Sequence, residues 1–422
     1  MSISLVHGND SISCWVPGTL YFKGSKMNTI RLTSALALSL SLLAPNGHAS
    51  FYDPIDNKLD LGEHLAENAY GFLPIPILIT EPAVGLGGGV IGLFLHESED
   101  EKNARKQLAM TSLDGGAQLM PAAITLAGAA GTENGTWFAF SGHRHSWLKD
   151  TIRYTGGVGA GKANLDIFKE FSIGASYNKT IQFGTKTSGV AALQQLQFRV
   201  ANTPLMLGVK QIIGQSSVEF ETSNEDVNNV INGVIHYFMG ESSVTSGLGV
   251  VAEYDTRNNM FFPTNGYSVN AEYMVYDEKI GSDWNYQNLN INGEVYIPVA
   301  ERWTLAFAGN YQNFNTQEHY LPPTVRPYVE LRGIASYRYQ GDEIATAQSQ
   351  VTYAIDNRWT VSAFYGQGKA TVEGSLSDDE SVDAYGAGFR YQIARRYGLH
   401  MGVDLAFGDD DSAFYITVGS GF

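Results

Sequence analysis

Histidines and clustered carboxylates are the side chains of this sequence that could support acid–base or metal chemistry. His143 and His145 flank Arg144, and acidic residues form runs at 97–101 and 409–411. No order of serine, histidine and aspartate and no glycine-rich phosphate loop stands in a strand-to-helix context. We therefore predict no enzymatic site, cofactor or metal. A lipid hydrolase, which would need a serine with a histidine partner in an accessible cavity or at its rim, is the alternative.

Most other charged and amide side chains alternate with apolar residues, which is the pattern of β-strands with one polar and one apolar face. In residues 399–408, apolar side chains at the odd positions leave His400 and Asp404 on the other face. The alternation places on the polar face Glu253, Asp255, Glu272, Asn290, Asn292, Glu294, Gln348, Gln350, Arg390, His400 and Asp404. Strands of this kind predict a membrane barrel with a wet, charged interior.

The last ten residues show the same alternation and end on an aromatic residue. Phe414, Ile416 and Val418 share one face with Phe422, whereas Tyr415 lies on the other. A terminal phenylalanine that closes an alternating strand is typical of bacterial outer-membrane barrels. We therefore predict that Phe422 lies on the lipid face and is an assembly signal for the outer-membrane assembly machinery.

The start of the chain has the features of a secretory signal peptide. Residues 32–44 are apolar but too few to span a bilayer, basic residues precede them, and small residues stand at the two positions that matter for cleavage before Ser50. We predict that residues 1–49 are a signal peptide. Translation starts either at Met27 or, with a longer leading region, at Met1. The only cysteine, Cys14, leaves with this segment, as suits export by an oxidising route.

Composition narrows the class of protein further. The formal net charge of −16 argues against a nucleic-acid partner. After the signal, no segment has the uninterrupted apolar run of a membrane helix, so a membrane location requires a closed barrel. The 46 glycines, 23 tyrosines and 21 phenylalanines suit tilted strands with aromatic girdles.

Period-two alternation predicts an all-β fold, a transmembrane antiparallel barrel of about sixteen strands. The predicted strands are 86–97, 115–128, 135–146, 151–163, 174–183, 191–202, 205–216, 246–256, 267–278, 285–297, 302–314, 343–355, 358–370, 381–393, 399–408 and 412–422. Short inner turns are predicted at 202–204, 298–301, 356–357 and 394–398, and long outer loops at 98–114, 217–245 and 315–342. Residues 50–85 are then a periplasmic lead-in or a plug, and residues 86–422 are the barrel.

This placement puts the acidic runs at 97–101 and 409–411 in outer loops. We interpret them as solvated loop charge. The alternative is that they bind divalent cations that bridge the protein to lipopolysaccharide. The other predicted contacts of the surface are outer-membrane lipids.

One turn carries a resemblance to a known family. Residues 254–266 resemble the periplasmic turn of the bacterial surface antigen barrel family, the BamA and TamA type, whose pattern is roughly YDTRDNxFFPTxG. The matching residues include Tyr254, Asp255, Arg257, Pro263 and Gly266. Asp255 and Arg257 can close the turn, while Pro263 and Gly266 set its backbone.

Two further motifs resemble the same family. Leu331, Arg332 and Gly333 are similar to the (V/L)RG(F/Y) motif of a loop that folds into the lumen, although Ile334 replaces the usual aromatic residue. A later strand resembles the FxDxG motif through Phe364, Gly366 and Gly368. The resemblance implies that Arg332 reaches into the lumen and pairs with acids on that wall, a task that suits the guanidinium fork.

The usual acidic partners of that arginine are replaced here. Gly366 stands where the family has aspartate, and Gln348 or Gln350 replaces the inward acid of the preceding strand. Arg332 is expected either to pair with another lumen acid, Glu294 or Asp404, or to bond neutral partners such as the two glutamines. The alternative is an ordinary arginine in a surface loop.

The resemblance covers the barrel only. Larger members of the family carry periplasmic POTRA domains that receive client chains, and residues 50–85 are too short for such a domain. The sequence therefore predicts a POTRA-less member. Three functions are expected from it: a barrel for protein insertion or translocation, a passive pore or structural barrel, or a surface protein that binds through its outer loops. The client or solute is not specified.

Overall fold

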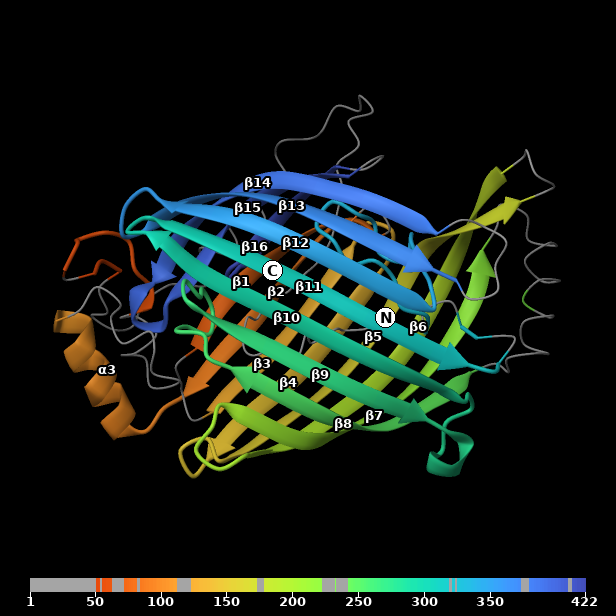
Figure 1. The fold of residues 1–422 in the computed structure, drawn as a ribbon, viewed down its shortest axis with the longest axis horizontal. Coiled ribbons are helices and arrows are strands. Elements are labelled where there is room, and N and C mark those ends of the chain that lie inside the picture. Colours follow the sequence, from red (N-terminus) through yellow and green to blue (C-terminus); the bar gives the residue numbers. More distant parts are fainter. Residues whose placement is uncertain are drawn as a thin grey trace.

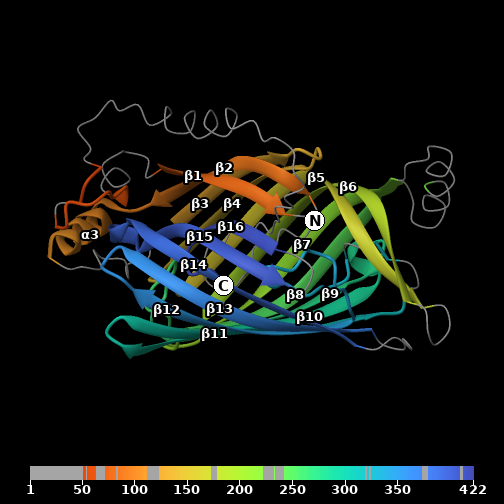
Figure 2. The same ribbon diagram turned by 90° about the horizontal axis from the view of Figure 1, so that it is seen from above.

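The predicted alternation of apolar and polar residues produces sixteen antiparallel strands, which pair in chain order from β1 to β16 in the computed structural model (Figure 1). The structure describes residues 51–53, 55–62, 72–81, 84–111, 123–172, 178–221, 232, 242–318, 321–322, 325–372, 379–408 and 412–422. The predicted signal peptide lies outside them. The sheet curls into a nearly closed barrel, with β1 beside β16 (Figures 1 and 2).

The elements of the first half are β1 (Phe72–Glu81), β2 (Gly85–His96), α3 (Glu99–Thr111), β3 (Ala123–Thr132), β4 (Trp137–Trp147), β5 (Ile152–Ser172), β6 (Asn178–Arg199), β7 (Leu205–Glu221) and β8 (Ser243–Asp255). Those of the second half are β9 (Gly266–Tyr276), η1 (Glu278–Ile280), β10 (Tyr286–Ala300), β11 (Trp303–Thr316), β12 (Glu343–Ala354), β13 (Trp359–Thr371), β14 (Glu380–Ala394), η2 (Arg395–Tyr397), β15 (Leu399–Gly408) and β16 (Ser412–Val418). None of the described helices is long and apolar enough to cross a membrane.

Burial confirms that the strands have two different faces. Val250, Leu405 and Phe407 are about half exposed and point outward, whereas Asp404, next to Leu405 on β15, is fully buried. Trp147, Trp303 and Trp359 are also exposed, each at a strand end beside a short turn. We call this end of the barrel the short-turn end. In outer-membrane barrels, short turns face the periplasm and aromatic girdles mark the membrane interfaces.

The barrel begins earlier than predicted, because residues 72–81 are its first strand. Residues 50–85 are predicted as a lead-in or plug. Pro74 and Pro76 lack backbone donors, which disfavours a strand paired on both sides. In the structure β1 pairs with β2 in unbroken register from Phe72↔Phe94 to Glu81↔Gly85. Proline is tolerated in an edge strand when the missing donor faces away from the paired neighbour. The prolines therefore mark an edge rather than a loop.

Two predicted strands are one strand in the structure. Residues 174–183 and 191–202 are predicted as separate strands, but β6 runs through both as Asn178–Arg199. It pairs with the 21 residues of β5 in one register. A tilted strand needs only about 9 to 11 residues to cross a bilayer, so this hairpin extends well beyond it. The predicted count of sixteen is correct because this error and the missed β1 offset each other.

The segment 98–114 lies at the opposite end from the one predicted. It connects β2 to β3, and its helix α3 lies beside η2 in the short turn between β14 and β15. Adding β1 to the barrel reverses the direction assigned to β2, which moves this connection from the outer to the inner end. The acidic run 97–101 is therefore not on the outer surface, and the run 409–411 lies outside the described residues.

Candidate functional site

The family-like turn between β8 and β9 is closed by charge pairs. Asp255 accepts hydrogen bonds from the backbone N–H and the Nε of Arg257, at 2.8 and 3.2 Å. Arg257 Nη1 also contacts Glu294 Oε2 at 3.2 Å. Gly266 adopts φ +100°, and a Cβ there would lie 2.4 Å from the carbonyl oxygen of Thr256. Glu294 is therefore a partner of the turn and not of Arg332, which corrects one of the predicted alternatives.

The tip of this turn reaches the place where β1 and β16 meet. Asn259 Oδ1 accepts the backbone N–H groups of Phe261 and Phe262, both at 2.7 Å. Phe261 packs in an apolar cluster with inward-facing residues of β1, β2, β3 and β15. The ring of Phe262 stacks on His400 with centroids 3.9 Å apart. The turn therefore contacts strands on both sides of the junction from within the barrel.

The segment that carries the arginine motif, residues 317–342, is here called the Arg332 loop. Val329, Leu331 and Ile334 of this loop pack on buried residues of β12, β13 and β14. Glycines on the wall make room for them, since a Cβ at Gly368 would lie 2.3 Å from Val329 Cγ1. A Cβ at Gly366 would lie 3.0 Å from Leu331 Cδ2. The residue that replaces the family's aspartate thus provides space for an apolar side chain of the loop.

Arg332 lies inside the barrel, with only 2 % of its surface exposed. Its Nη1 donates to Asp404 Oδ2 and its Nη2 donates to Gln350 Oε1, both at 3.0 Å. The guanidinium also lies over the ring of Phe364, 3.5 Å from the centroid. Of the four predicted partners, the structure brings Asp404 and Gln350 to Arg332. Within the described residues, Glu294 and Gln348 do not bond to it.

Sequence reasoning placed Arg390 on the inner face but missed its part in this site. Arg390 donates to both oxygens of Asp404, at 2.7 and 2.8 Å. One buried carboxylate therefore serves two buried guanidinium groups, which leaves an excess positive charge. The π faces of Phe364 and Phe422 lie beside Arg332 and offset part of this excess. The signal that could have revealed Arg390 is its position opposite Gly402, two residues from Asp404.

The end of the chain turns into the barrel, which corrects the predicted position of Phe422. Strand β16 stops at Val418, and Gly419 and Gly421 take positive φ values of 104° and 95°. The ring of Phe422 lies 5.4 Å from the Arg332 guanidinium and 6.2 Å from the ring of Tyr296. Burial alternates as predicted up to Thr417, but Val418 is buried in the apolar cluster with Phe261, and the two glycines bend the backbone and reverse the facing of the last residue. The proposed assembly role of Phe422 stays a prediction.

Gly333 offers a test of how closely the Arg332 loop is seated. Its φ is +97°, a Cβ would lie 3.1 Å from backbone atoms of Phe407, and its N–H donates to Tyr415 Oη at 2.7 Å. Gly333→Ala should therefore strain the backbone and displace the loop, at a cost of about 1 to 3 kcal/mol. Faster trypsin cleavage within residues 326–338 would report the displacement. Gly293→Ala, where a Cβ meets nothing closer than 3.9 Å, is the control and should behave as the wild type.

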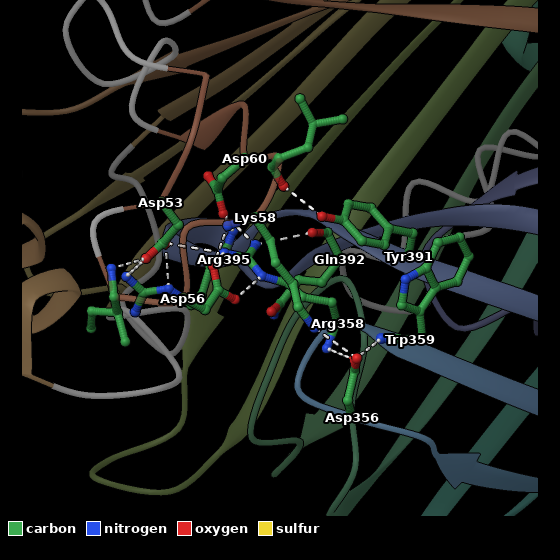
Figure 3. Close-up of polar contacts among 12 residues, drawn as sticks. Asp53, Asp56, Lys58, Asp60, Asp356, Arg358, Trp359, Tyr391, Gln392 and Arg395 are labelled. Atoms are coloured by element: carbon green, nitrogen blue, oxygen red, sulfur yellow. Dashed lines mark hydrogen bonds and ion pairs between the residues drawn. The ribbon is translucent and has the colours of Figure 1, made fainter.

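A second cluster of charges, unpredicted from the sequence, joins the start of the described chain to the short-turn end (Figure 3). Residues 51–62, here called the N-terminal segment, place three aspartates around the buried Arg358. Arg358 Nε donates to Asp56 Oδ2 at 2.6 Å, its Nη1 donates to Asp60, and its Nη2 lies 3.2 Å from Asp53 Oδ2. Arg358 stands in the turn between β12 and β13.

The same segment also contacts the neighbouring turn between β14 and β15. Arg395 Nε donates to Asp53 Oδ2 at 2.6 Å, and its backbone N–H donates to Asp60 Oδ2 at 2.9 Å. At the edge of the cluster, Lys58 Nζ contacts Asp356 Oδ2 at 2.7 Å. The N-terminal segment, which precedes β1 in the sequence, is therefore held to turns of the last strands. The spacing of aspartates at 53, 56 and 60 was the available signal.

These carboxyls make the docking of the N-terminal segment sensitive to acid. Burial raises the pKa of Asp53 and of Asp56, but the hydrogen bonds from Arg395 and Arg358 outweigh it, so both pKa values are lowered. The hydrogen bond from Lys58 is the main cause that lowers the pKa of Asp356 to about 2. A carboxyl whose pKa is lowered by docking stabilises the docked state at pH values above its ordinary pKa of about 4.

We therefore expect the N-terminal segment to stay docked at pH 5 to 8 and to loosen as the pH falls from about 4 towards 2. Hydrogen–deuterium exchange of residues 51–62, corrected for the intrinsic effect of pH, measures this. Exchange that rises instead between pH 8 and 6 would show that other groups control docking.

Comparison with known proteins agrees with the geometry. The model of the Omp85 superfamily domain matches residues 127–422. The structure of BamA from Haemophilus ducreyi lacking POTRA domains 1–3 is similar, with 17 % identity, a TM-score of 0.50, and coverage of 92 % of this chain and 79 % of that chain. CdiB from Acinetobacter baumannii and CdiB from Escherichia coli are each 9 % identical over 83 % of this chain, with TM-scores of 0.51 and 0.52.

This chain spans 59 % and 62 % of the two CdiB chains. At these identities the structural matches establish a shared fold. A search of curated proteins finds no significant match. The family model covers more than half of the sequence and includes the β8–β9 turn, the Arg332 loop and the last strand. The predicted family and outer-membrane barrel fold are thereby confirmed, and the chain belongs to the Omp85 superfamily.

Proposed function

We propose that this protein assists the insertion or translocation of protein chains at the outer membrane, and that the client engages the junction between β1 and β16. The observation that supports this most is the junction itself. Each consecutive pair from β1–β2 to β15–β16 has a hydrogen-bonded register, and within the described residues none links β16 to β1. An unpaired strand edge is a template for another chain.

Three features keep the two edges from pairing. Pro74 and Pro76 remove two donors from β1, and the register with β2 is unbroken, so the missing donors face β16. Strand β16 has only seven residues, against ten in β1 and β15. Strand β16 ends at Val418, and Gly419 and Gly421 take positive φ values that turn the chain towards Arg390 and Arg332 inside the barrel. Each feature lowers the cost of separating the edges.

The junction can be tested by locking it. The only cysteine is Cys14, so cysteine pairs introduced along β1 and β16 can form a reversible crosslink without competition from the barrel. Liposomes that contain the reduced protein should speed the folding of a denatured outer-membrane barrel, and oxidation should abolish the gain until reductant is added. A pair at Leu207 and Ala252, which already face each other in β7 and β8, is the control. No gain over empty liposomes would contradict the proposal.

A passive pore is the second candidate, because one inner wall is lined with neutral amides. Asn290 accepts a hydrogen bond from Asn292 and another from Asn310, at 3.2 and 2.8 Å. Gln312 extends this row through Asn310 at 3.1 Å. Such a wall suits passage of polar solutes. Steady conductance of the wild-type protein in planar bilayers, unaffected by Arg332→Ala, would favour this function over the first.

A further inference from the structure

The outward wall of β2, β3 and β4 carries polar side chains where apolar ones are expected. On β2, Ile91 and Leu93 are buried inside, whereas Val90 is half exposed. His96 is an even number of residues from Val90 and therefore lies on the same outward face. On β4, exposed Trp137 and Trp147 have the same parity as His143 and His145. The three histidines therefore lie on the face that meets lipid.

These residues form one connected cluster. Thr125 stands opposite His143 in the register of β3 and β4. Its hydroxyl contacts His96 Nε2 at 2.8 Å and His143 Nδ1 at 2.7 Å. The rings of His143 and His145 are 5.8 Å apart, and His145 lies 4.3 Å from the ring of Trp147. We call His96, Thr125, His143 and His145 the histidine patch.

The register places the patch at the depth of the membrane interface. His96 is the last residue of β2 and stands opposite Ala123, as His145 does from the other side. Trp147 is two residues further towards the short-turn end. With a rise of about 3.3 Å per residue and a tilt of about 40°, His145 lies about 5 Å and His143 about 10 Å from the level of Trp147. Tryptophan rings mark the level of the lipid headgroups, so His145 lies close beneath the headgroups and glycerol backbones.

The hydrogen bonds leave several ring nitrogens available. The Thr125 hydroxyl can donate to only one of its two histidine partners, so the other histidine must donate to it. Within the described residues, the second nitrogens of His96 and His143 and both nitrogens of His145 have no hydrogen-bond partner. The residues of β5 opposite His143 and His145 are Gly156 and Tyr154, so no acid faces them from that strand. A polar group at a lipid face without a partner is costly.

We propose that the histidine patch binds the phosphate of a phospholipid in the periplasmic leaflet. Phosphate offers only hydrogen-bond acceptors and a negative charge, which matches imidazole donors in either the neutral or the protonated form. Its glycerol and acyl chains would run along the outward faces of β2 and β4, towards Val90 and Trp137. This site adjoins β1 but does not depend on the proposed function of the junction.

Native mass spectrometry of the full chain tests the site. The protein is released gently from nanodiscs of phosphatidylethanolamine and phosphatidylglycerol, and bound lipid is counted in the wild type and in the triple variant His96→Leu, His143→Leu and His145→Leu. The wild type should retain phospholipid, and the triple variant should lose at least tenfold in retention. Because leucine suits a lipid-facing wall, the variant should still fold, as shown by heat-modifiable migration.

Two controls define the ligand. Ser349→Leu removes a polar group from the outward wall of β12 and should retain lipid as the wild type does. In nanodiscs that mix phospholipid with a phosphate-free diacyl glycolipid, the wild type should select the phospholipid. Equal retention by the triple variant, no preference for phosphate, or loss of a co-purifying protein in place of lipid would each overturn the proposal.

Discussion

Asp404→Asn is expected to release the Arg332 loop from the wall of the barrel while the strands stay paired. The carboxylate is fully buried and is the acid that bonds both Arg332 and Arg390. Its removal leaves two buried guanidinium groups without their common counter-ion, which costs about 3 to 5 kcal/mol. Trypsin should therefore cleave the loop at Arg326, Arg332 or Arg338 at least tenfold faster than in the wild type.

Asp383→Asn is the matched control, because Asp383 is an exposed acid on the same sheet that accepts a hydrogen bond from a glutamine, Gln367, at 3.0 Å. It should leave cleavage unchanged. Arg332→Ala should have a smaller effect of about 1 to 3 kcal/mol, since Asp404 keeps Arg390. If the effects of Asp404→Asn and Arg332→Ala on cleavage simply add, the two residues do not act together and the assigned pairing is wrong.

Arg358→Met is expected to undock the N-terminal segment. Arg358 has no exposed surface and contacts Asp53, Asp56 and Asp60 together. Among the described residues, removal of this cation leaves Asp53 with the Arg395 guanidinium and takes the buried guanidinium from Asp56 and Asp60, at a cost of about 3 to 5 kcal/mol. Residues 51–62 should then exchange their amide hydrogens at least tenfold faster, with little change in β7 to β12.

The control for this variant is Arg302→Met in the neighbouring short turn between β10 and β11. Arg302 is exposed and bonds one carbonyl, that of Ile355, at 3.3 Å. Its loss should not change exchange of the N-terminal segment. Unchanged exchange in Arg358→Met would mean that apolar contacts such as those of Leu61 hold the segment, and that the charges are secondary.

The fold was largely predictable because the sequence of each strand shows which of its residues face outward and which face inward. From β7 to β16 the predicted ranges agree with the structure within a few residues at most ends, since alternation of apolar and polar residues is a local property. The errors, which are the missed β1, the division of β6 and the wrong end for segment 98–114, concern pairing and strand direction, which alternation does not report. Pro74 and Pro76 are compatible with a strand only if it has no paired neighbour on one side. Whether a strand lies at such an edge depends on the topology of the whole sheet.

The candidate site was predictable where a motif marked it. Arg332 was singled out with Asp404 and Gln350 among its possible partners, and these contacts are present. The contacts of Arg358 and Arg395 with the N-terminal segment were not anticipated. They join residues 302 and 342 positions apart, and the sequence does not show which arginine an aspartate will meet at such separations.

The N-terminal segment also has a consequence for the order of folding. Asp56 precedes Arg358 by 302 residues, and its binding position exists only after β12 to β15 have formed their turns. Contacts so distant in sequence form late, because a long loop must close first. The earliest residues of the described chain are therefore among the last to find their partners. During refolding, protection of their amide hydrogens from exchange should therefore appear only after β12 to β15 have paired.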